Sequence, residues 1–278
     1  MSDLPPELAA KSAALLHRLA GFDRVVVAYS GGVDSAVVAR AAREACGERA
    51  RAVPAVSASL AQGELEHAQE LARLIGIAHE VIETREFDNP SYIANPANRC
   101  YHCKTELYNQ LDALCERWPG AVVVNGANVD DLGDWRPGLQ AAREHQVDSP
   151  LVAVGISKAE VRALAKHWQL PAWDKPASPC LSSRVAYGIA VTPERLARID
   201  ASERFIREEL GVRELRVRLE ANELARIEVP LAEVPRLVAE GVSQRVAQRL
   251  RELGFRAVCL DLEGFRSGSL NDLLPVRG

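Results

Sequence analysis

Hydrophobic positions up to about residue 188 alternate between short continuous runs and longer stretches with helical spacing. A continuous apolar run is typical of a strand that is buried on both faces, as in a parallel sheet. Such runs occupy residues 24–30, 51–57, 79–82 and 121–125. Helical patterns occupy the stretch up to residue 20 and residues 34–46, 64–75, 104–118 and 157–168, the last opened by a Ser-Lys-Ala-Glu capping box. This alternation predicts an α/β fold with a doubly wound parallel sheet.

The pattern changes after about residue 188. Helical patterns cover residues 192–210 and most of 231–253, and strand-like patterns cover residues 214–219, 224–229 and 257–262. The residues Glu-Ala-Asn-Glu between the first two of these strands favour a hairpin. This order predicts a small α+β domain over residues 189–278, which follows a larger α/β domain over residues 1–188.

The segment Ser-Gly-Gly-Val-Asp-Ser, residues 30–35, stands between the first predicted strand and the helix after it. Glycines there let the backbone turn tightly toward an anion, and the first N–H groups of the helix then point at that anion. Asp34 places a carboxylate beside the expected phosphate, which predicts an intervening Mg²⁺. The spacing does not fit the Walker phosphate loop. The alternative is an ordinary strand-to-helix turn that Asp or Ser caps.

Composition limits the class of protein. The 278 residues include 34 Lys and Arg against 38 Asp and Glu, a formal net charge of −4, and 47% of them are hydrophobic. This is a globular composition without an apolar run that would span a membrane, and its acidic balance argues against a large nucleic-acid surface. The first residues lack the basic and apolar regions of a secretory signal, so we expect a cytoplasmic protein with reduced cysteines.

Two groups of cysteines stand where chemistry is favoured. Cys100 and Cys103 form a Cys-x-x-Cys pair, a spacing that suits a shared metal or cluster, a redox couple or an inert pair. A second such pair is absent, so a four-cysteine zinc site is not supported. Cys180 lies in the proline-stiffened segment Lys-Pro-Ala-Ser-Pro-Cys-Leu-Ser-Ser-Arg. Lys175 and Arg184 in this segment favour a thiolate that acts as nucleophile or ligand.

The loop at residues 125–138 follows a predicted strand and is expected at the same sheet edge, because ligands bind at the carboxyl ends of parallel strands. Gly126 allows a base or ribose to approach, Asp130 and Asp131 are candidate Mg²⁺ ligands, and Arg136 is a candidate phosphate ligand. A polar loop built of Asx turns is the alternative.

Arg216 and Arg218 alternate along one predicted strand of the C-terminal domain and so project from the same face. Two cations on one face need anions. Either glutamates across the hairpin, such as Glu228, supply them, or a polyanionic substrate does.

Five motifs, in this order, carry a resemblance to a known family. They are Ser-Gly-Gly-Val-Asp-Ser, Arg-Cys-Tyr-His-Cys-Lys, Asn-Val-Asp-Asp-Leu-Gly-Asp-Trp-Arg-Pro-Gly, Lys-Pro-Ala-Ser-Pro-Cys-Leu-Ser-Ser-Arg and Ala-Arg-Ile-Glu-Val-Pro. The first resembles the pyrophosphate loop of the N-type ATP pyrophosphatases. Together, over about residues 8–265, they resemble the LarE family of ATP-dependent sulfur transferases. The resemblance implies a domain of the adenine nucleotide alpha hydrolase type, a small C-terminal domain and assembly as a hexamer.

The LarE resemblance implies a two-step reaction on pyridinium-3,5-biscarboxylic acid mononucleotide, in the biosynthesis of the nickel-pincer nucleotide. A substrate carboxylate attacks the α-phosphorus of ATP and releases pyrophosphate, and sulfur then displaces AMP to leave a thiocarboxylate. The candidates for binding ATP are Ala28, Ser30, Gly31, Gly32, Asp34, Ser35, Ser57, Gly126 and Arg136. The candidates for the substrate phosphate are Arg216 and Arg218, with Ser183, Arg184, Glu203 and Glu228 beside them.

Two versions of the sulfur step are known in this family. In one, the cysteine that corresponds to Cys180 gives up its own sulfur and becomes dehydroalanine. In the other, three cysteines hold a [4Fe-4S] cluster whose open iron binds hydrosulfide. Cys100, Cys103 and Cys180 stand where the second version has its cysteines, so the resemblance implies cluster chemistry here. The sequence does not identify the sulfur donor.

Two other functions stay open. A tRNA thiolase of the same superfamily would also combine the glycine loop with cysteines, but it would need a basic RNA-binding surface. A nucleotide-sensing or cluster-carrying scaffold would bind nucleotide without releasing pyrophosphate.

Overall fold

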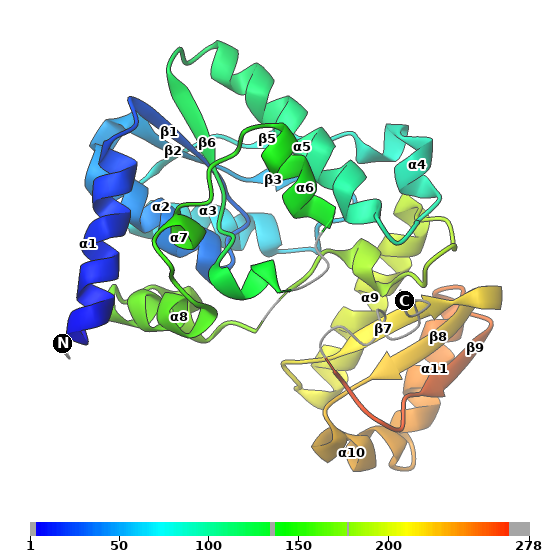
Figure 1. Cartoon of the computed structure of the whole chain (residues 1–278). Helices are drawn as coiled ribbons and strands as arrows, with labels where there is room; N and C mark the ends of the chain where they lie inside the picture. The colour runs from blue at the N-terminus through cyan, green and yellow to red at the C-terminus, as the bar shows by residue number, and fades with distance from the viewer. Residues whose placement is uncertain (1–3, 134–136, 177, 267–278) are drawn as a thin grey trace. The chain divides into compact units, whose positions relative to one another are not determined.

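The computed structural model describes residues 4–133, 137–176 and 178–266, which divide into two compact units (Figure 1). Unit 1 consists of Met1–Ser57, Gly63–Glu86 and Asn98–Ala177. Unit 2 consists of Ala58–Gln62, Phe87–Ala97 and Ser178–Gly278. The division of the chain into domains at residues 188 and 189 stays a prediction.

Parallel strands form the centre of unit 1. Four of them pair in the order β4–β2–β1–β6, over Ala78–His79, Ala50–Val53, Arg24–Ala28 and Ala121–Val124. A second parallel pair joins β3, Ala55–Val56, to β5, Ile82–Glu83. The run predicted as one strand over residues 51–57 is divided at Pro54, because proline has no N–H for the hydrogen-bond ladder. The run at residues 79–82 is likewise divided between β4 and β5.

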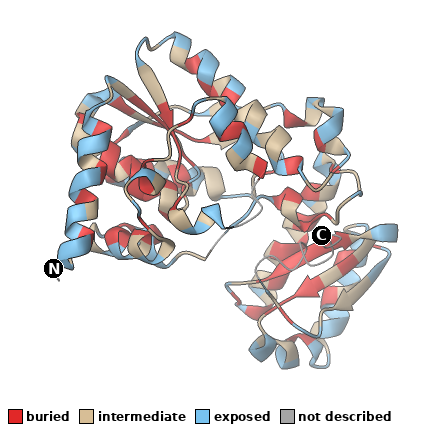
Figure 2. Ribbon diagram, in the orientation of Figure 1, coloured by how far each residue is buried: buried red, intermediate tan, exposed pale blue. Residues whose placement is uncertain are grey.

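Helices pack on both faces of this sheet, which confirms the doubly wound fold. They are α1, Pro6–Ala20, α2, Val33–Cys46, α3, Glu64–Ile75, α5, Arg99–Glu116, α6, Pro137–Glu144, α7, Pro150–Ala153, and α8, Lys158–His167. Val25 and Val27 of β1 are buried in a core with α1, α2, α3 and α8, whereas Val26 is buried in a second core with α5 and α6. Successive side chains of a strand point to opposite faces of the sheet, so a strand between two cores must be apolar at every position. The centre of β1 is accordingly buried (Figure 2).

The strand order of unit 1 reverses beside β1. From β1 the chain continues to β2 and β4 on one side of the sheet, whereas β6 pairs on the other side. Such a reversal opens a crevice at the carboxyl ends of the strands, where open α/β sheets bind their ligands. The loops after β1 and β6 therefore border the expected binding site.

Unit 2 contains a three-stranded sheet. Strand β7, Arg216–Glu220, pairs antiparallel with β8, Leu224–Glu228, and β8 pairs parallel with β9, Ala257–Leu260. The antiparallel pair confirms the predicted hairpin. The helices of unit 2 are α4, Pro90–Ile93, α9, Pro193–Leu210, α10, Val234–Val238, and α11, Val242–Glu252. The helical stretch predicted over residues 231–253 is thus interrupted before Gly241, whose φ of +82° a helix does not tolerate.

Two early segments of the chain complete unit 2. The N–H of Leu181 donates to the carbonyl oxygen of Ser59 at 2.8 Å, and the hydroxyl groups of Tyr92 and Ser182 lie 2.7 Å apart. The side-chain amide of Asn95 donates to two backbone carbonyls beyond this turn, at 3.2 and 2.8 Å. The 3₁₀ turn at Leu181–Arg184, directly after Cys180, is therefore fixed by residues 90 or more positions earlier.

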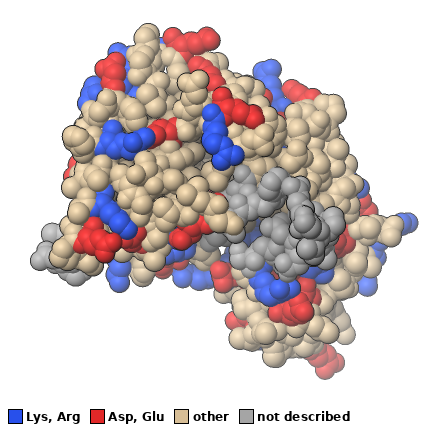
Figure 3. All heavy atoms as spheres, viewed as in Figure 1, with Lys and Arg blue, Asp and Glu red and all other residues tan. Residues whose placement is uncertain are grey.

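Charges on the face drawn in Figure 3 are mixed. Lys and Arg side chains alternate there with Asp and Glu side chains, in keeping with the net charge of −4.

Candidate active site

The glycine loop, residues 30–35 between β1 and α2, turns on Gly31. Its φ of +72° lies in the left-handed region, which glycine adopts without strain. A Cβ atom at Gly31 would lie 2.8 Å from the Cβ of Ala68 and 2.9 Å from the Cα of the same residue. Ala68 belongs to α3, so this helix packs directly against the loop and leaves room for glycine alone.

The two serines of the glycine loop bind each other across it. The hydroxyl groups of Ser30 and Ser35 lie 3.1 Å apart, and the Ser35 hydroxyl donates to the carbonyl oxygen of Gly32 at 3.1 Å. Gly32 is the N-cap of α2 and provides no capping side chain. The N–H groups in the first turn of α2 therefore suit an anion, as phosphate binding at a helix N-terminus requires.

Gly126 follows β6 and lies against the start of α2. A Cβ atom there would lie 2.7 Å from the backbone nitrogen of Ser35 and 3.0 Å from the carbonyl carbon of Asp34. Asn125, one residue earlier, accepts hydrogen bonds through Oδ1 from the Ala127 N–H and the Ser149 hydroxyl, both at 3.0 Å. The structure thus brings Gly126 and the glycine loop together, while contact of Gly126 with a base or ribose stays a prediction.

Asp34 is the acidic centre of this region. Its Oδ1 accepts a hydrogen bond from Nδ2 of Asn128 at 3.1 Å, and its Oδ2 forms an ion pair with the ammonium group of Lys158. Asp130 accepts from the backbone N–H of Lys158 at 2.6 Å, and Asp131 accepts from the N–H of Asn128 at 3.0 Å. Asp34 therefore contacts both Asn128 and Lys158, whereas the carboxylate of Asp130 contacts Lys158 and that of Asp131 contacts Asn128. Their role as metal ligands stays a prediction.

Sequence reasoning missed Lys158 and Asn128. They are separated from Asp34 by 124 and 94 positions, and only the folded chain brings the three together. Lys158 is visible in the sequence as the first helical residue after the capping Ser157, but nothing local shows that its side chain reaches Asp34.

Two of the candidates for binding ATP, Ala28 and Ser57, lie at the ends of strands. Ala28 ends β1 and is half-buried, and Ser57 follows β3. The Ser57 hydroxyl donates to Oε1 of Glu86 at 2.6 Å, and Glu86 is 1% exposed. Glu86 is a third residue that sequence reasoning missed, because a single glutamate in a polar segment carries no local signal. Arg136 lies outside the described residues.

Cys100 and Cys103 lie in the first two turns of α5. This helix begins at Arg99, five residues before the predicted start, so the Cys-x-x-Cys pair is helical. Residues three apart lie on the same side of a helix, which places both thiols on one face. Cys100 is exposed and Cys103 is half-buried, whereas burial raises the pKa of the Cys46, Cys115 and Cys259 thiols.

Cys180, in unit 2, is exposed on a rigid base. Its carbonyl oxygen accepts hydrogen bonds from the Ser183 hydroxyl at 2.7 Å and from Nη1 of Arg184 at 2.9 Å. Arg184 is 2% exposed, and its guanidinium binds both carboxylate oxygens of Glu203 on α9, at 2.9 and 3.2 Å. Arg184 therefore fixes the backbone that presents the Cys180 thiol.

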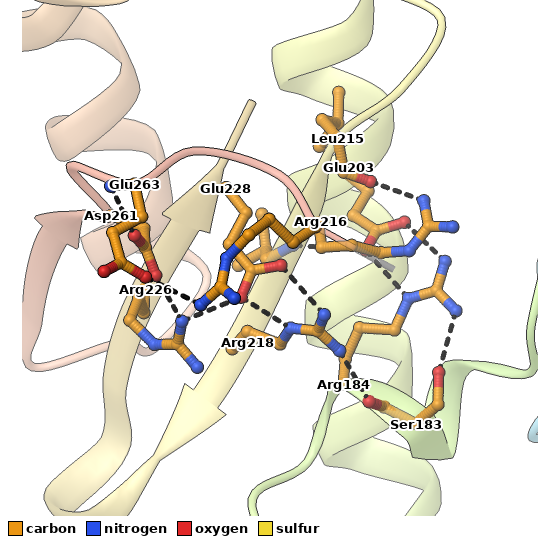
Figure 4. A network of polar contacts seen from close by, with 12 residues as sticks. Ser183, Arg184, Glu203, Leu215, Arg216, Arg218, Arg226, Glu228, Asp261 and Glu263 are labelled. Carbon is orange, nitrogen blue, oxygen red and sulfur yellow. Dashed lines mark hydrogen bonds and ion pairs between the residues drawn. The ribbon is translucent and has the colours of Figure 1, made fainter. Parts of the chain in front are cut away.

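The other arginines predicted for substrate phosphate lie in the same network of buried charges (Figure 4). Arg218 binds Glu228 through Nε at 3.0 Å and Nη2 at 2.8 Å, and it donates to the carbonyl oxygen of Ser183 at 2.8 Å. These contacts are the glutamate partners that the hairpin alternative predicts. Arg216 packs with its guanidinium 5.0 Å from the ring centre of Phe265. Burial and the charge of Arg184 lower the pKa of Arg216 to about 10. Phosphate binding by these residues stays a prediction.

Within residues 4–133, 137–176 and 178–266, no three His, Cys, Asp or Glu side chains are grouped closely enough to hold a metal ion. Over the same ranges, none of the helices has the length and apolar character needed to cross a bilayer.

The parallel sheet, the switch point and the glycine loop define an ATP pyrophosphatase of the PP-loop superfamily. In agreement, the model of the NAD synthase family matches residues 14–97, which include β1, the glycine loop, α2 and α3. A pyridinium-3,5-bisthiocarboxylic acid mononucleotide synthase of Lactiplantibacillus plantarum is 37% identical over 269 residues, which is 96% of each chain. The chain belongs to the LarE family of ATP-dependent sulfur transferases, which confirms the resemblance read from its motifs.

Two other relatives differ in how much of the chain they cover. An uncharacterized protein of Synechocystis is 49% identical over 91% of this chain and 93% of its own length. A tRNA-specific 2-thiouridylase of Xanthobacter autotrophicus is 31% identical over 192 residues, which is 56% of this chain and 49% of that protein. The similarity to the thiouridylase is thus partial, whereas the other two relatives match nearly end to end.

Proposed function

We propose that the protein converts a carboxylate of pyridinium-3,5-biscarboxylic acid mononucleotide to a thiocarboxylate, driven by cleavage of ATP to AMP and pyrophosphate. The reaction belongs to the biosynthesis of the nickel-pincer nucleotide. One observation carries the proposal: an uncapped helix N-terminus behind the glycine loop, in a chain that matches the Lactiplantibacillus synthase over 96% of both lengths. That geometry suits the pyrophosphate part of ATP.

The first step joins the substrate to AMP. A carboxylate oxygen attacks the α-phosphorus, and the bond between the α-phosphorus and the bridging oxygen breaks, so pyrophosphate leaves with the electron pair. The N–H groups at the start of α2 and the hydroxyl groups of Ser30 and Ser35 bind the leaving pyrophosphate. Developing negative charge on that group is stabilised by donors that are already in position. Ala28, Ser57 and Gly126 border the nucleoside.

Mg²⁺ fits the donor set beside the glycine loop. Carboxylate and phosphate oxygens are the ligands that this ion prefers. Asp34 is the first candidate ligand, because it lies in the first turn of α2 with 25% of its side chain exposed. Asp130 and Asp131 each already accept a hydrogen bond from a backbone N–H and would contribute their remaining oxygens. The ion would neutralise phosphate charge during the attack.

The second step replaces AMP by sulfur. A sulfur nucleophile attacks the acyl carbon, and the carbon–oxygen bond to AMP breaks. A [4Fe-4S] cluster on Cys100, Cys103 and Cys180 would supply that sulfur as hydrosulfide from its open iron. The donor chemistry fits, since two of these thiols share one helix face and Cys180 is exposed. Arg184 and Ser183 hold the Cys180 backbone during this step. The alternative is that Cys180 gives up its own sulfur and becomes dehydroalanine.

The C-terminal unit is proposed to bind the phosphate of the mononucleotide. Arg216 and Arg218 would approach it, with Ser183 and Arg184 beside them, while Glu203 and Glu228 hold the guanidinium groups in place. Guanidinium groups suit phosphate because their paired N–H donors match its oxygens. Arg184 is held buried by its ion pair with Glu203, and Arg218 by its ion pair with Glu228.

The proposal is tested with protein reconstituted and purified without oxygen. ATP, Mg²⁺, sulfide and the mononucleotide are mixed with it, and pyrophosphate release and product mass are measured. The expected product has one oxygen of the mononucleotide replaced by sulfur. The protein itself is expected to contain about four iron and four sulfide per chain. Pyrophosphate release that does not depend on the mononucleotide would contradict the proposal. An iron-free protein that makes the thiocarboxylate once, with loss of the Cys180 sulfur, would favour the sacrificial alternative.

A tRNA thiolase is the second candidate, favoured by the partial identity to the Xanthobacter thiouridylase. Mixed charges on the face in Figure 3 and a net charge of −4 do not suit RNA binding. Unmodified tRNA added to the same assay decides between the two, since only a thiolase would incorporate sulfur into it.

We also propose that the protein works in the cytoplasm as a hexamer. Among the described residues of unit 2, large apolar side chains are exposed at Leu231, by 61%, at Val238, by 55%, and at Leu262, by 82%. Such side chains favour a protein interface where they form one contiguous patch. Light scattering on the eluting protein gives the mass, and Leu262→Glu is expected to shift it toward smaller species. A wild-type monomer at micromolar concentration would contradict the hexamer.

A further inference from the structure

Phe265 lies against one of the buried arginines of unit 2. The centre of its ring is 5.0 Å from the guanidinium carbon of Arg216, which is within the range of a cation–π contact. Arg216 is 8% exposed, and its Nη1 donates to the carbonyl oxygen of Leu215 at 2.6 Å. Phe265 is half-buried. Unit 2 therefore places an aromatic ring on a buried cation that belongs to the proposed phosphate site.

A short turn after β9 brings the ring of Phe265 to Arg216. The turn begins at Asp261, whose carboxylate accepts a hydrogen bond from Nη1 of Arg226 at 2.6 Å. At its end the N–H of Phe265 donates to the carbonyl oxygen of Val229 at 2.9 Å. Between them Gly264 has a φ of +74°, and a Cβ atom there would lie 2.9 Å from the same carbonyl oxygen. The backbone that carries the ring is therefore fixed.

The contact of Arg216 with this ring differs in kind from the ion pairs of its neighbours Arg184 and Arg218 (Figure 4). Each neighbour forms a fork with a buried carboxylate, that of Glu203 or that of Glu228. A carboxylate fork takes two N–H donors of a guanidinium and cancels its charge. An aromatic ring attracts a guanidinium through its quadrupole and leaves the charge in place. The ring contact thus orders Arg216 and keeps its charge for a ligand.

Positive charge gathers around Arg216. Burial lowers the pKa of Arg216 to about 10, and the charges of Arg184 and Arg218 act in the same direction against that of Glu203. The guanidinium of Arg216 is still protonated at neutral pH. Its surroundings are therefore electropositive, which favours a bound anion. A phosphate monoester, which is largely dianionic at neutral pH, is a ligand of this chemistry.

We infer that Phe265 is a positioning residue for the phosphate of the mononucleotide. Its ring holds the guanidinium of Arg216 in place before the substrate arrives, so the charge meets the phosphate without reorganisation. The inference rests on the proposed phosphate site of unit 2 and adds to it a residue that acts through Arg216. Its effect is specific to the phosphate, because this is the group that Arg216 binds in that proposal.

The test measures the dissociation constants of the mononucleotide, of its dephosphorylated riboside and of ATP. Phe265→Leu keeps an apolar side chain but removes the ring. It is expected to weaken mononucleotide binding about 5- to 30-fold, the range for one buried cation–π contact, and to leave the other two constants unchanged. Phe265→Tyr has a ring again and is expected to stay within about twofold of wild type. Equal weakening of mononucleotide and riboside, or no weakening, would overturn the inference.

Kinetics give a second readout that a merely structural role would not produce. In the exchange of labelled pyrophosphate into ATP, Phe265→Leu should raise KM for the mononucleotide and keep kcat within about twofold of wild type, because ground-state binding alone is lost. A decrease in kcat at unchanged KM would contradict a role in positioning the phosphate ligand.

A double-variant cycle links the ring to its cation. Arg216→Gln alone is expected to weaken mononucleotide binding about 10- to 100-fold, the range for one charged hydrogen bond. Adding Phe265→Leu should then weaken it by less than about twofold, because the ring no longer has a charge to hold. Fully additive effects would overturn the inference. Arg216→Gln that binds the mononucleotide as tightly as wild type would instead remove the proposed phosphate site itself.

Phe255→Leu is the matched control. The ring of Phe255 is 2% exposed, and its centre is 5.4 Å from the guanidinium carbon of Arg198, which pairs with Glu223. The variant loses the same kind of contact in the same unit without touching Arg216. All three dissociation constants are expected at wild-type values, below a melting temperature that is measured for each variant. Weaker mononucleotide binding in this control as well would overturn the inference, because it would assign the effect to the stability of unit 2.

Discussion

Arg184 donates a hydrogen bond to the carbonyl oxygen of Cys180 at 2.9 Å, from a guanidinium that Glu203 holds with both carboxylate oxygens. The thiol of Cys180 is exposed, whereas Arg184 and Glu203 are almost fully buried. Glu203 also accepts from the backbone N–H of Val217 on β7 at 3.1 Å. The position of the reactive segment is thus linked to the sheet of unit 2 through one buried ion pair.

Removing the glutamate of this pair should destabilise the protein. Glu203→Gln leaves Arg184 buried without a carboxylate, which costs about 3 kcal/mol in the free energy of unfolding. Urea unfolding followed by circular dichroism measures the change. Glu252→Gln is the control, since Glu252 and its partner Arg249 are 50% and 46% exposed. The control should change stability by less than about 0.5 kcal/mol. An equally small effect of both variants would contradict the role of the buried pair.

Gly31→Ala is expected to weaken ATP binding more than tenfold. The new methyl group would lie 2.8 Å from Ala68, and the positive φ adds a strain of about 1 kcal/mol. Calorimetry or equilibrium dialysis measures the dissociation constant of ATP. The double variant Gly31→Ala with Ala68→Gly should recover part of the affinity, because it removes one of the clashing atoms.

Gly155→Ala separates strain from crowding. Gly155 has a similar φ of +71°, and a Cβ there would meet nothing within 4 Å. This variant should lose about 1 kcal/mol of stability and keep its ATP affinity. Loss of ATP binding in both variants would show that strain alone accounts for the effect at Gly31.

Cys180→Ser should leave the adenylation step intact and stop sulfur transfer. A hydroxyl group neither donates sulfur nor binds iron as a thiolate does. Exchange of labelled pyrophosphate into ATP, in the presence of the mononucleotide, should stay within about twofold of wild type, whereas thiocarboxylate is not formed. Cys259→Ser in β9 is the control and should keep both activities. Sulfur transfer by Cys180→Ser at the wild-type rate would rule out Cys180 as nucleophile or ligand.

The free energy of unfolding should decrease as the pH is lowered, because Glu160 becomes protonated. Hydrogen bonds from Lys11 and from the backbone N–H of Ser157 lower the pKa of Glu160 below its ordinary value of 4.5. The folded state then holds this carboxylate ionised at a pH where the unfolded chain already binds a proton. The stabilisation is therefore fully present above about pH 5 and is lost as the pH falls through the lowered pKa.

Thermal melting between about pH 3 and pH 6 measures this loss. From pH 6 to pH 3, the melting temperature of the wild-type protein should decrease more than that of Glu160→Gln. Glu7→Gln is the control, because Glu7 lies 3.9 Å from the same lysine and is 84% exposed. A wild-type curve that runs parallel to that of Glu160→Gln would contradict the prediction.

Local patterns predicted the elements of unit 1 well, because each strand must be apolar on both faces. The run Val25, Val26 and Val27 alone predicts β1, whichever elements pack against it. The glycine loop was equally easy to predict, because two glycines between an apolar strand and a helix are typical of an anion-binding turn. Local chemistry also explains where the pattern misled, as at Pro54, where a missing N–H divides one apolar run into two strands.

The contacts that organise the site are long-range, and no pattern in the sequence reports them. Lys158 reaches Asp34 across 124 positions, and Gly31 is required because of a neighbour on another helix. Glu86 is hidden for the same reason, since only folding buries it beside Ser57. The sequence shows that Arg216 and Arg218 project from the same face of their strand. Which glutamates form ion pairs with them depends on the register of β7 and β8.

The composition of unit 2 has a consequence for the order of events during synthesis. Residues 58–62 and 87–97 leave the ribosome early, but their contacts with Leu181 and Ser182 form only after these two residues have been made. A nascent chain that ends near residue 177 contains every described strand of the parallel sheet, while most of unit 2 is still missing. Unit 2 therefore folds after unit 1. A chain that is truncated before unit 2 is complete keeps part of this unit unfolded and is a substrate for chaperones.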